Sequence, residues 1–307
     1  MRFLVDTDAG VDDALALILL LAAPEAEVRA ITATDGNVPL PQVVRNVLEI
    51  VERMGRAVPV YPGARGPLLP EPRERAAFFH GEDGLGNLRD RRARGRPEAT
   101  PAALAIVEAA RAQPGGLTLV ALGPLTNLAL ALALDPELPR RLARVVVMGG
   151  AHAGRGNTGT LTAEFNFRAD PEAAAAVLAA FPRLTLLTWE TTLAHPLPWP
   201  AHQQLKRLGT PRARFYAAIT GVTEAYLREK DLPGLLVPDP LAALVALEPG
   251  AITAQERHWG TVETCGRHTR GQLVLDHRRS GRAANLEVVT GVAVDRLADR
   301  LEAALAG

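Results

Sequence analysis

Short apolar runs alternate along this chain with alanine-rich segments, and this alternation limits the possible folds more than any other feature. Five runs rich in Val, Ile and Leu predict buried strands: Phe3–Val5, Val28–Thr34, Leu117–Leu122, Val145–Met148 and Leu184–Leu187. The segments between them have helical composition: Asp13–Ala23, Leu40–Met54, Pro101–Ala112, Thr126–Ala133 and Pro171–Ala180. The pattern predicts an α/β fold with a mostly parallel central sheet and helices on both faces.

The start of two helices carries a local signal. Thr100 before Pro101 and Asp170 before Pro171 each place a capping residue ahead of a proline in the first turn. No long linker or internal repeat divides the 307 residues, so we expect a single domain over residues 1–307. The stretch from Tyr61 to Pro97 is rich in Pro, Gly and Arg and predicts an irregular excursion at the surface.

Composition excludes several classes of function. The 34 acidic residues balance the 34 basic ones, which argues against binding to nucleic acid, and we interpret the run Arg89–Arg96 as a solvated loop. The longest apolar stretch, Ala14–Ala23, is too short to cross a membrane, and the N-terminus does not resemble a signal peptide. With Cys265 as the only cysteine, no internal disulfide can form. We therefore expect a soluble, cytoplasmic protein.

An acidic cluster follows the first predicted strand. The segment Asp6-Thr7-Asp8-Ala9-Gly10-Val11-Asp12-Asp13 places four carboxylates within eight residues. One or two of them are explained as caps of the following helix. Four mutually repelling carboxylates on one turn indicate a bound hard cation such as calcium or magnesium. The cluster lies after a strand, where ligands bind in an open parallel sheet.

Two metal-binding motifs can be compared with this cluster. An EF-hand loop that began at Asp6 would need Gly at its sixth place and Glu at its twelfth. Val11 and Leu17 occupy those places, so the EF-hand is excluded. A phosphatase of the haloacid-dehalogenase type also opens with a strand and an Asp-x-Asp pair, here Asp6 and Asp8. The segment by itself leaves that alternative open.

Further motifs decide the matter through a family resemblance. The acidic cluster with Ala14-Leu15-Ala16 after it resembles the opening signature of the inosine-uridine nucleoside hydrolase family. More stretches match that family in order: Gly36-Asn37-Val38, His80-Gly81-Glu82-Asp83-Gly84-Leu85-Gly86, Leu122-Gly123-Pro124-Leu125-Thr126-Asn127, Met148-Gly149-Gly150, Asn157, Ala163-Glu164-Phe165-Asn166, Asp170-Pro171-Glu172-Ala173 and Asp239-Pro240-Leu241-Ala242. Each match alone is weak, and together they cover the chain from Asp6 to about Leu244.

The resemblance implies an N-glycosyl hydrolase that cleaves purine or pyrimidine ribonucleosides to ribose and free base, in nucleoside salvage. It implies a calcium ion held by the carboxylates of Asp8, Asp13 and Asp239 and by the backbone carbonyl of Leu122. Asp8 would also be the general base that takes a proton from a calcium-bound water attacking C1′ of the ribose. Asp6 would orient the cluster from behind. The family also forms homodimers or homotetramers, and we expect the same of this chain.

The residues that contact substrate are implied in the same way. Ribose hydroxyls would be held by Asp12, Asn157, Glu164 and Asn166, with Asn37 close by. Tyr226 and Lys230, one helical turn apart, fall where family members place residues that determine base specificity. Attack by water in one step would invert the configuration at C1′.

The chain departs from the family at Pro238. Many members have a histidine there that is thought to protonate the departing base, which proline cannot do. Either His80 or the Tyr226/Lys230 pair would then serve, or the base would leave without an acid, stacked on Phe165 or Trp259. A third possibility is an N-riboside with a better leaving group. A protein that only binds ribosides is the non-enzymatic alternative.

The remaining histidines and tryptophans match no motif. We interpret the histidines as structural or surface residues: His152, His195, His202, His258, His268 and His277. Trp189 and Trp199 flank a proline-rich stretch, and we expect them to be packing residues. The sequence does not decide which nucleobase is preferred.

Overall fold

An eight-stranded sheet, in the order β3-β2-β1-β4-β5-β6-β12-β9, forms the centre of the fold. The structure is a computed structural model that describes residues 1–72, 74–278 and 280–307. The strands of the sheet are β1 (Arg2–Thr7), β2 (Glu27–Ala33), β3 (Val60–Pro62), β4 (Leu117–Ala121), β5 (Arg144–Met148), β6 (Leu184–Leu187), β9 (Ile252–His258) and β12 (Leu286–Val292). Every neighbouring pair is parallel except β12 and β9, which pair antiparallel at one edge.

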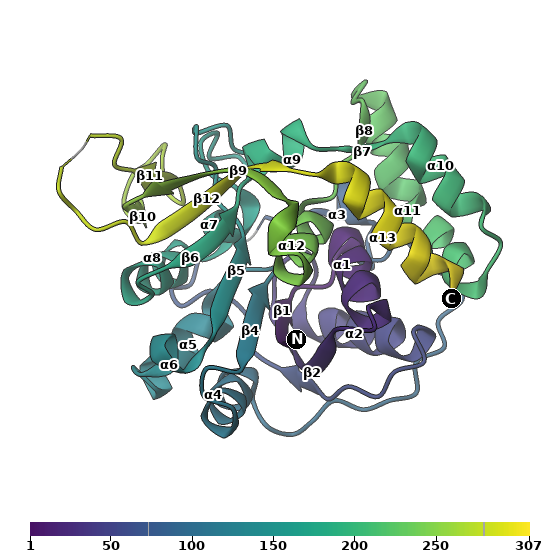
Figure 1. The fold of residues 1–307 in the computed structure, drawn as a ribbon, viewed down its shortest axis with the longest axis horizontal. Coiled ribbons are helices and arrows are strands. Elements are labelled where there is room, and N and C mark those ends of the chain that lie inside the picture. The colour runs from purple at the N-terminus through teal and green to yellow at the C-terminus, as the bar shows by residue number, and fades with distance from the viewer. Residues whose placement is uncertain (73, 279) are drawn as a thin grey trace.

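Helices cover both faces of this sheet (Figure 1). One face carries α1 (Val11–Ala22), α2 (Leu40–Arg53), α11 (Pro211–Glu229), α12 (Pro238–Leu247) and α13 (Val294–Ala306), and the other carries α4 (Ala102–Ala112), α5 (Thr126–Leu134) and α8 (Pro171–Ala180). Side chains of β1 alternate between the two apolar cores: Phe3 and Val5 belong to one, and Leu4 to the other. The predicted α/β class with a mostly parallel sheet is confirmed.

Shorter elements complete the chain. They are α3 (Ala77–His80), α6 (Leu138–Arg141), α7 (Phe165–Ala169), α9 (Trp189–Ala194), α10 (Trp199–Arg207), a 3₁₀ turn (Pro249–Ala251) and two antiparallel strand pairs, β7 (Leu197–Pro198) with β8 (Gly234–Leu235) and β10 (Gly260–Val262) with β11 (Leu273–Leu275). The predicted cap at Asp170 is correct, because its carboxylate accepts a hydrogen bond from the N–H of Ala173. The predicted cap at Thr100 is wrong: α4 begins at Ala102, with Pro101 as its N-cap and no side-chain cap.

The strand order places a switch point at β1. From β1 the chain first moves outward through β2 and β3, then returns to the other side of β1 with β4 and continues through β5 and β6. In sheets of this kind the ligand crevice opens where the order reverses, beyond the carboxyl ends of the strands. Asp8 follows the end of β1 and Leu122 follows the end of β4, so both lie at this crevice.

Two buried helices begin at the same crevice. Asp12 and Asp13 stand in the first turn of α1, and Asp239 stands in the first turn of α12. All ten residues of α12 are buried, and the helix packs closely against α1. The positive end of each helix dipole is therefore directed toward the acidic groups, which favours their ionised form.

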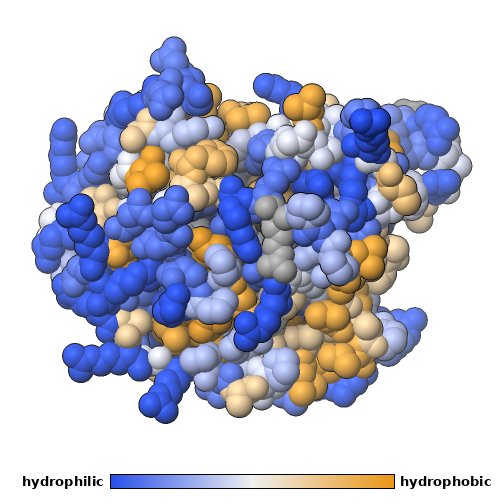
Figure 2. All heavy atoms as spheres, turned by 180° about the vertical axis from the view of Figure 1, so that it is seen from behind, coloured by the Kyte–Doolittle hydropathy of each residue, from blue (hydrophilic) through white to orange (hydrophobic). Residues whose placement is uncertain are grey.

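The surface is largely hydrophilic, as the rear face in Figure 2 shows, although hydrophobic side chains gather toward its lower right. Large apolar residues that stand exposed include Leu161 at 79%, Phe78 at 58% and Leu134 at 56%. None of the helices in the described parts of the chain combines the length and the apolar character that crossing a bilayer requires.

Candidate active site

A cavity of about 300 Å³ opens at the crevice. Eleven of the predicted site residues line it: Asp12, Asn37, His80, Leu122, Asn157, Glu164, Phe165, Asn166, Tyr226, Lys230 and Asp239. These residues come from loops and helix starts that are far apart in the sequence, and the fold brings them to one hollow. Asp8 and Asp13 lie behind the lining, with exposures of 1% and 0%.

Three carboxylates converge on the floor of the cavity. Asp12, Asp13 and Asp239 each offer one oxygen, and these atoms lie within 4.8 Å of one another. Asp13 is held in place by the Thr7 hydroxyl and by the N–H of Gly10, which donates to its Oδ2 at 2.8 Å. Asp12 was predicted as a ribose contact, and the geometry adds it to the groups that could hold a metal ion.

Asp8 lies beside this trio and is held by the turn after β2. The N–H of Asn37 donates to Asp8 Oδ2 at 2.7 Å. A Cβ on Gly36 would collide with the same carboxylate, and one on Gly123 would come within 3.0 Å of Oδ1, so both glycines permit the close approach. Asp8 Oδ1 is buried, and among the described residues it has no hydrogen-bond partner.

Burial and mutual repulsion make these carboxylates hard to ionise. Burial raises the pKa of Asp12 to about 6, and burial with the charge of Asp12 raises the pKa of Asp13 to about 6. Burial raises the pKa values of Asp8 and Asp239 well above their ordinary range, and the neighbouring carboxylates raise them further. A cluster of this kind, with an unpartnered buried oxygen, fits a hard cation that offsets the repulsion.

Asp6 lies near the end of β1 and is fully buried. Its Oδ1 accepts hydrogen bonds from Thr32 Oγ1 at 2.5 Å and from Asn127 Nδ2 at 2.8 Å. Burial raises the pKa of Asp6 to about 7. Asp6 does not line the cavity, so its contacts tie β1 to β2 and α5 rather than to a ligand.

Glu164 and Asn166 form the opposite wall. Glu164 caps α7 and accepts hydrogen bonds from the backbone N–H groups of Gly150 at 2.8 Å and Asn166 at 2.9 Å. Burial raises the pKa of Glu164 to about 7. Asn166 Nδ2 donates to the carbonyl of Leu122 at 2.7 Å, which orients this amide against the end of β4. Asn157, by contrast, is exposed at the rim.

The mouth of the cavity is aromatic. The ring of Tyr226 lies 5.2 Å from that of Phe78 and 5.9 Å from that of Phe79, and Lys230 Nζ lies 5.7 Å from the Tyr226 ring centroid. Pro238, directly before Asp239, also lines the cavity. Tyr226 and Lys230 thus lie close together at the end of α11 and both line the cavity, and Phe78 is an addition that the sequence did not indicate.

Trp259 and Trp189 differ from their predicted places in relation to the cavity. Trp259 lies in a separate surface groove, 4.2 Å below the guanidinium of Arg282, so its predicted stacking on the base is wrong. Trp189, predicted only to pack, contacts the core and also lines the cavity. Trp189 stands at the start of α9, directly after the carboxyl end of β6, and this place after a strand was the available signal.

His80 is a neutral histidine in this site. The N–H of Val11 donates to His80 Nδ1 at 3.1 Å, so the ring proton resides on Nε2. Burial lowers the pKa of His80 to about 4, so at neutral pH the ring is uncharged and its Nε2–H is available to donate a hydrogen bond. None of the other six histidines lines the cavity, and His202 is buried between Tyr216 and Glu224.

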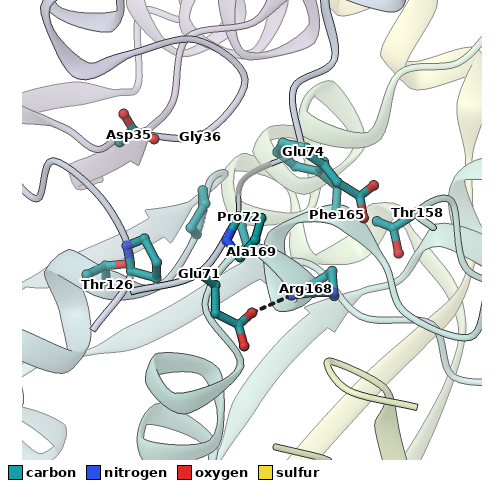
Figure 3. Close-up of a pocket in the computed structure, with 12 residues that line it drawn as sticks. Asp35, Gly36, Glu71, Pro72, Glu74, Thr126, Thr158, Phe165, Arg168 and Ala169 are labelled. Atoms are coloured by element: carbon teal, nitrogen blue, oxygen red, sulfur yellow. Dashed lines mark hydrogen bonds and ion pairs between the residues drawn. The ribbon is translucent and has the colours of Figure 1, made fainter. Parts of the chain in front are cut away.

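A second, smaller cavity of about 30 Å³ lies behind Phe165 (Figure 3). Phe165 and Glu74 line both cavities. Residues 66–72 and 74–76 cover this cavity, and we name them the strap. Arg75, near the C-terminal end of the strap, lines the main cavity. The predicted irregular excursion is thus present, but part of it forms a wall of the site.

Comparison with known proteins agrees with the fold and the site. The family model described as inosine-uridine preferring nucleoside hydrolase matches residues 3–299. The chain is 35% identical over 306 residues to the pyrimidine-specific ribonucleoside hydrolase RihA of Citrobacter koseri, covering 97% of each chain. It is 37% identical to the non-specific ribonucleoside hydrolase RihC of Escherichia coli strain SE11, covering 92% of this chain and 91% of that one.

A solved structure is similar over the whole fold. The purine-preferring ribonucleoside hydrolase from Gardnerella vaginalis superposes with a TM-score of 0.92 at 30% identity, covering 100% of this chain and 98% of that chain. The fold and site define an N-glycosyl hydrolase on an open α/β sheet. The chain belongs to the inosine-uridine preferring nucleoside hydrolase family. The predicted family and enzyme class are confirmed, and the phosphatase alternative is excluded.

Proposed function

We propose that the whole chain, residues 1–307, is one domain that hydrolyses ribonucleosides to ribose and free base with a calcium ion as cofactor. The observation that carries this proposal is the convergence of Asp12, Asp13 and Asp239 within 4.8 Å, beside the unpartnered Oδ1 of Asp8. Oxygen ligands alone favour calcium over softer metals, which select nitrogen or sulfur.

The cation would be held by carboxylates of Asp8, Asp13 and Asp239 and by the carbonyl of Leu122, with Asp12 adjacent. The Leu122 carbonyl already accepts one hydrogen bond from Asn166, and its second lone pair is available. When bound, calcium supplies a Lewis acid that lowers the pKa of water and binds hydroxyl oxygens.

Asp8 is the general base in this proposal. The N–H of Asn37 fixes Oδ2, and Oδ1 has no partner among the described residues, so one oxygen is oriented while the other can accept a proton. The proton comes from the water that attacks C1′ as the bond to the base breaks. Attack in one step leaves no covalent intermediate and inverts C1′.

The ribose would lie between the acidic floor and the α7 wall. Its hydroxyls would form hydrogen bonds with the side chains of Asp12, Glu164, Asn166 and Asn157, with Asn37 nearby. Buried carboxylates close to the sugar stabilise the positive charge that develops as the N-glycosidic bond stretches. A 2′-deoxyribonucleoside leaves part of this set unpaired and is therefore a poor substrate.

The nucleobase would occupy the aromatic mouth, between Phe78, Tyr226 and Trp189. With proline at position 238, the groups able to assist its departure are the neutral Nε2–H of His80 and the ammonium of Lys230. Both donate a hydrogen bond to an acceptor on the base, which stabilises the charge left on it. The relatives are named as pyrimidine-specific, non-specific and purine-preferring, so we propose no single base.

We further propose a cytoplasmic homodimer or homotetramer. The single cysteine is exposed and unpaired, so the fold depends on no disulfide. Exposed leucines on α4 and α5, among them Leu104 at 39%, Leu130 at 37% and Leu134 at 56%, offer apolar area for a subunit contact.

Release of ribose as reducing sugar tests the function. Inosine, adenosine, guanosine, uridine and cytidine are each incubated with the protein in calcium and in chelator. The proposal expects calcium-dependent release from at least one of them. Release that is equal in chelator contradicts the metal assignment, and binding of nucleosides without release from any of them contradicts hydrolysis.

A further inference from the structure

The strap carries an arginine, Arg75, that contacts the turn next to the proposed general base, Asp8. Arg75 Nη1 lies 2.9 Å from Asp35 Oδ1, and its Nη2 donates to Asp35 Oδ2 at 3.2 Å, a bidentate pair. Arg75 Nη1 also donates to the carbonyl of Gly36. One guanidinium thus holds two consecutive residues of the turn after β2, and 29% of its side chain stays exposed at the cavity.

The same turn holds Asp8. The residue after Gly36 is Asn37, whose N–H donates to Asp8 Oδ2 at 2.7 Å, and Gly36 itself lies against that carboxylate. A side chain at position 36 has no room. Besides the main-chain hydrogen bond from the Asp35 N–H to the Ala64 carbonyl at 3.0 Å, two groups of the turn are available to a neighbouring side chain: the Gly36 carbonyl and the Asp35 carboxylate. Arg75 contacts both groups.

The middle of the strap is anchored on the ribose side. Glu71 accepts from Arg168 Nη1 at 2.8 Å, as the dashed line in Figure 3 marks, and pairs with Arg270 Nε at 2.6 Å. Glu74 accepts from the N–H of Gly159 at 3.2 Å. Arg168 belongs to α7, the helix that presents Glu164 and Asn166 to the cavity. The strap therefore contacts both α7, which carries the proposed ribose ligands, and the turn that orients the proposed general base Asp8.

We propose that Arg75 is a positioning residue, which acts through the Asp35–Asn37 turn to orient the Asp8 carboxylate for proton transfer and calcium binding. The inference rests on the proposed function, since it needs Asp8 to be the base and a calcium ligand. A base displaced by about 1 Å can lose about 10²-fold in rate, and outer contacts of metal ligands are worth about 10–100-fold in affinity or activity.

Arg75→Ala and Arg75→Lys test this, with Arg89→Ala as the control for loss of an exposed arginine that lines neither cavity. For Arg75→Ala we expect kcat at saturating calcium to fall about 10–100-fold, KM to change less than about 3-fold, and calcium affinity by calorimetry to weaken about 10-fold. Arg75→Lys keeps the positive charge but not the two-pronged guanidinium, so its kcat and calcium affinity should lie between those of the wild type and Arg75→Ala. Free guanidinium at millimolar concentration should replace the missing group, so it should raise kcat of Arg75→Ala but not kcat of the wild type or of Arg89→Ala.

Two outcomes overturn the inference. In the first, kcat and calcium affinity of Arg75→Ala both stay within about 2-fold of the wild type, instead of falling by the expected factor of about ten, which corresponds to 1.4 kcal/mol. The other is a raised KM with unchanged kcat, which means that Arg75 contacts the substrate directly. If wild type releases no ribose, the proposed function fails, and calcium affinity alone then decides the inference. Thermal unfolding checks that each variant is folded, and the Lys variant serves if Arg75→Ala is not.

Discussion

The backbone N–H of Asn37 donates a 2.7 Å hydrogen bond to Oδ2 of Asp8, whereas Oδ1 of that carboxylate has no partner among the described residues. One oxygen is therefore oriented by the main chain, and the other has no partner among the described residues that would occupy its lone pairs. A general base needs both properties, because its lone pair has to point at the proton it removes.

Gly36→Ala should damage the activity more than the fold. The added Cβ would meet the Asp8 carboxylate and displace it, so we expect kcat to fall about 10²-fold, as for a base displaced by about 1 Å. Gly221→Ala in α11 is the matched control, since a Cβ there meets nothing within 4 Å. That variant should keep full activity and gain about 0.5–1 kcal/mol of stability in a helix. Equal kcat in both variants would show that the close approach is unimportant.

Without calcium, the protein should become less stable as pH rises. Burial raises the pKa values of Asp12 and Asp13 to about 6 from an ordinary value of 3.8, so between these values the folded state binds more protons than the unfolded chain. Stability is then highest below about pH 4 for these groups and is lost as pH rises through about 6. The melting temperature in chelator, measured from pH 5 to pH 8, reports this fall.

Calcium should reverse that trend. A bound cation stabilises the ionised carboxylates, so the rise in melting temperature on adding calcium should be larger at pH 8 than at pH 5. Binding should also release protons, which calorimetry in two buffers of different ionisation enthalpy detects. A calcium effect that is the same at both pH values would contradict the placement of calcium at these carboxylates.

Pro238→His should raise turnover of substrates whose base is a poor leaving group. A histidine at the first position of α12 would lie beside the cavity and could donate a proton, an effect worth about 10²–10⁴-fold where it operates fully. We expect a gain of at least about tenfold in kcat for inosine or uridine. A riboside of 4-nitrophenol, which needs no acid, should show no gain. A gain that is equal for both substrates would argue against leaving-group protonation.

Trp189→Ala should weaken nucleoside binding, because aromatic stacking of a base is worth about 1–3 kcal/mol. The expected rise in KM is about 5-fold or more. Trp259→Ala is the matched control, since Trp259 lies in a different groove. Its KM should stay within about 2-fold of the wild type, given that it removes no stacking partner. Equal KM values in the two variants would remove Trp189 from the base site.

The sequence predicts the central parallel strands β1, β4, β5 and β6 well, because each is a short, mostly apolar run, but it misses the short parallel strand β3. It does not predict β9, whose residues are mostly polar and mostly exposed at the sheet edge. The run Leu286–Val292 carried the β-branched signal of a strand and was missed. Local composition thus predicts the strands that form continuous apolar runs, whereas it misses the edge strand β9 and also β12, which lies inside the sheet between β6 and β9.

The acidic cluster shows a different limit. Its segment near the N-terminus indicates a cation, yet its approach to Asp239 depends on the packing of α1 against α12, which no local pattern reveals. The family resemblance supplied that partner. Arg75 had no signal at all, because it lies in an irregular stretch whose composition indicates only a loop. Its contacts with Asp35 and Gly36 appear only in three dimensions.

The most direct test of the account is kcat of Asp8→Asn at saturating calcium, with the best ribonucleoside of the panel as substrate. Asparagine keeps the size of the side chain and an oxygen for the Asn37 N–H, but it cannot take up the proton. We predict a fall in kcat of about 10²–10⁴-fold, with the fold intact by thermal unfolding. A kcat of Asp8→Asn within about 3-fold of the wild type, far less than a lost general base costs, would contradict the central claim.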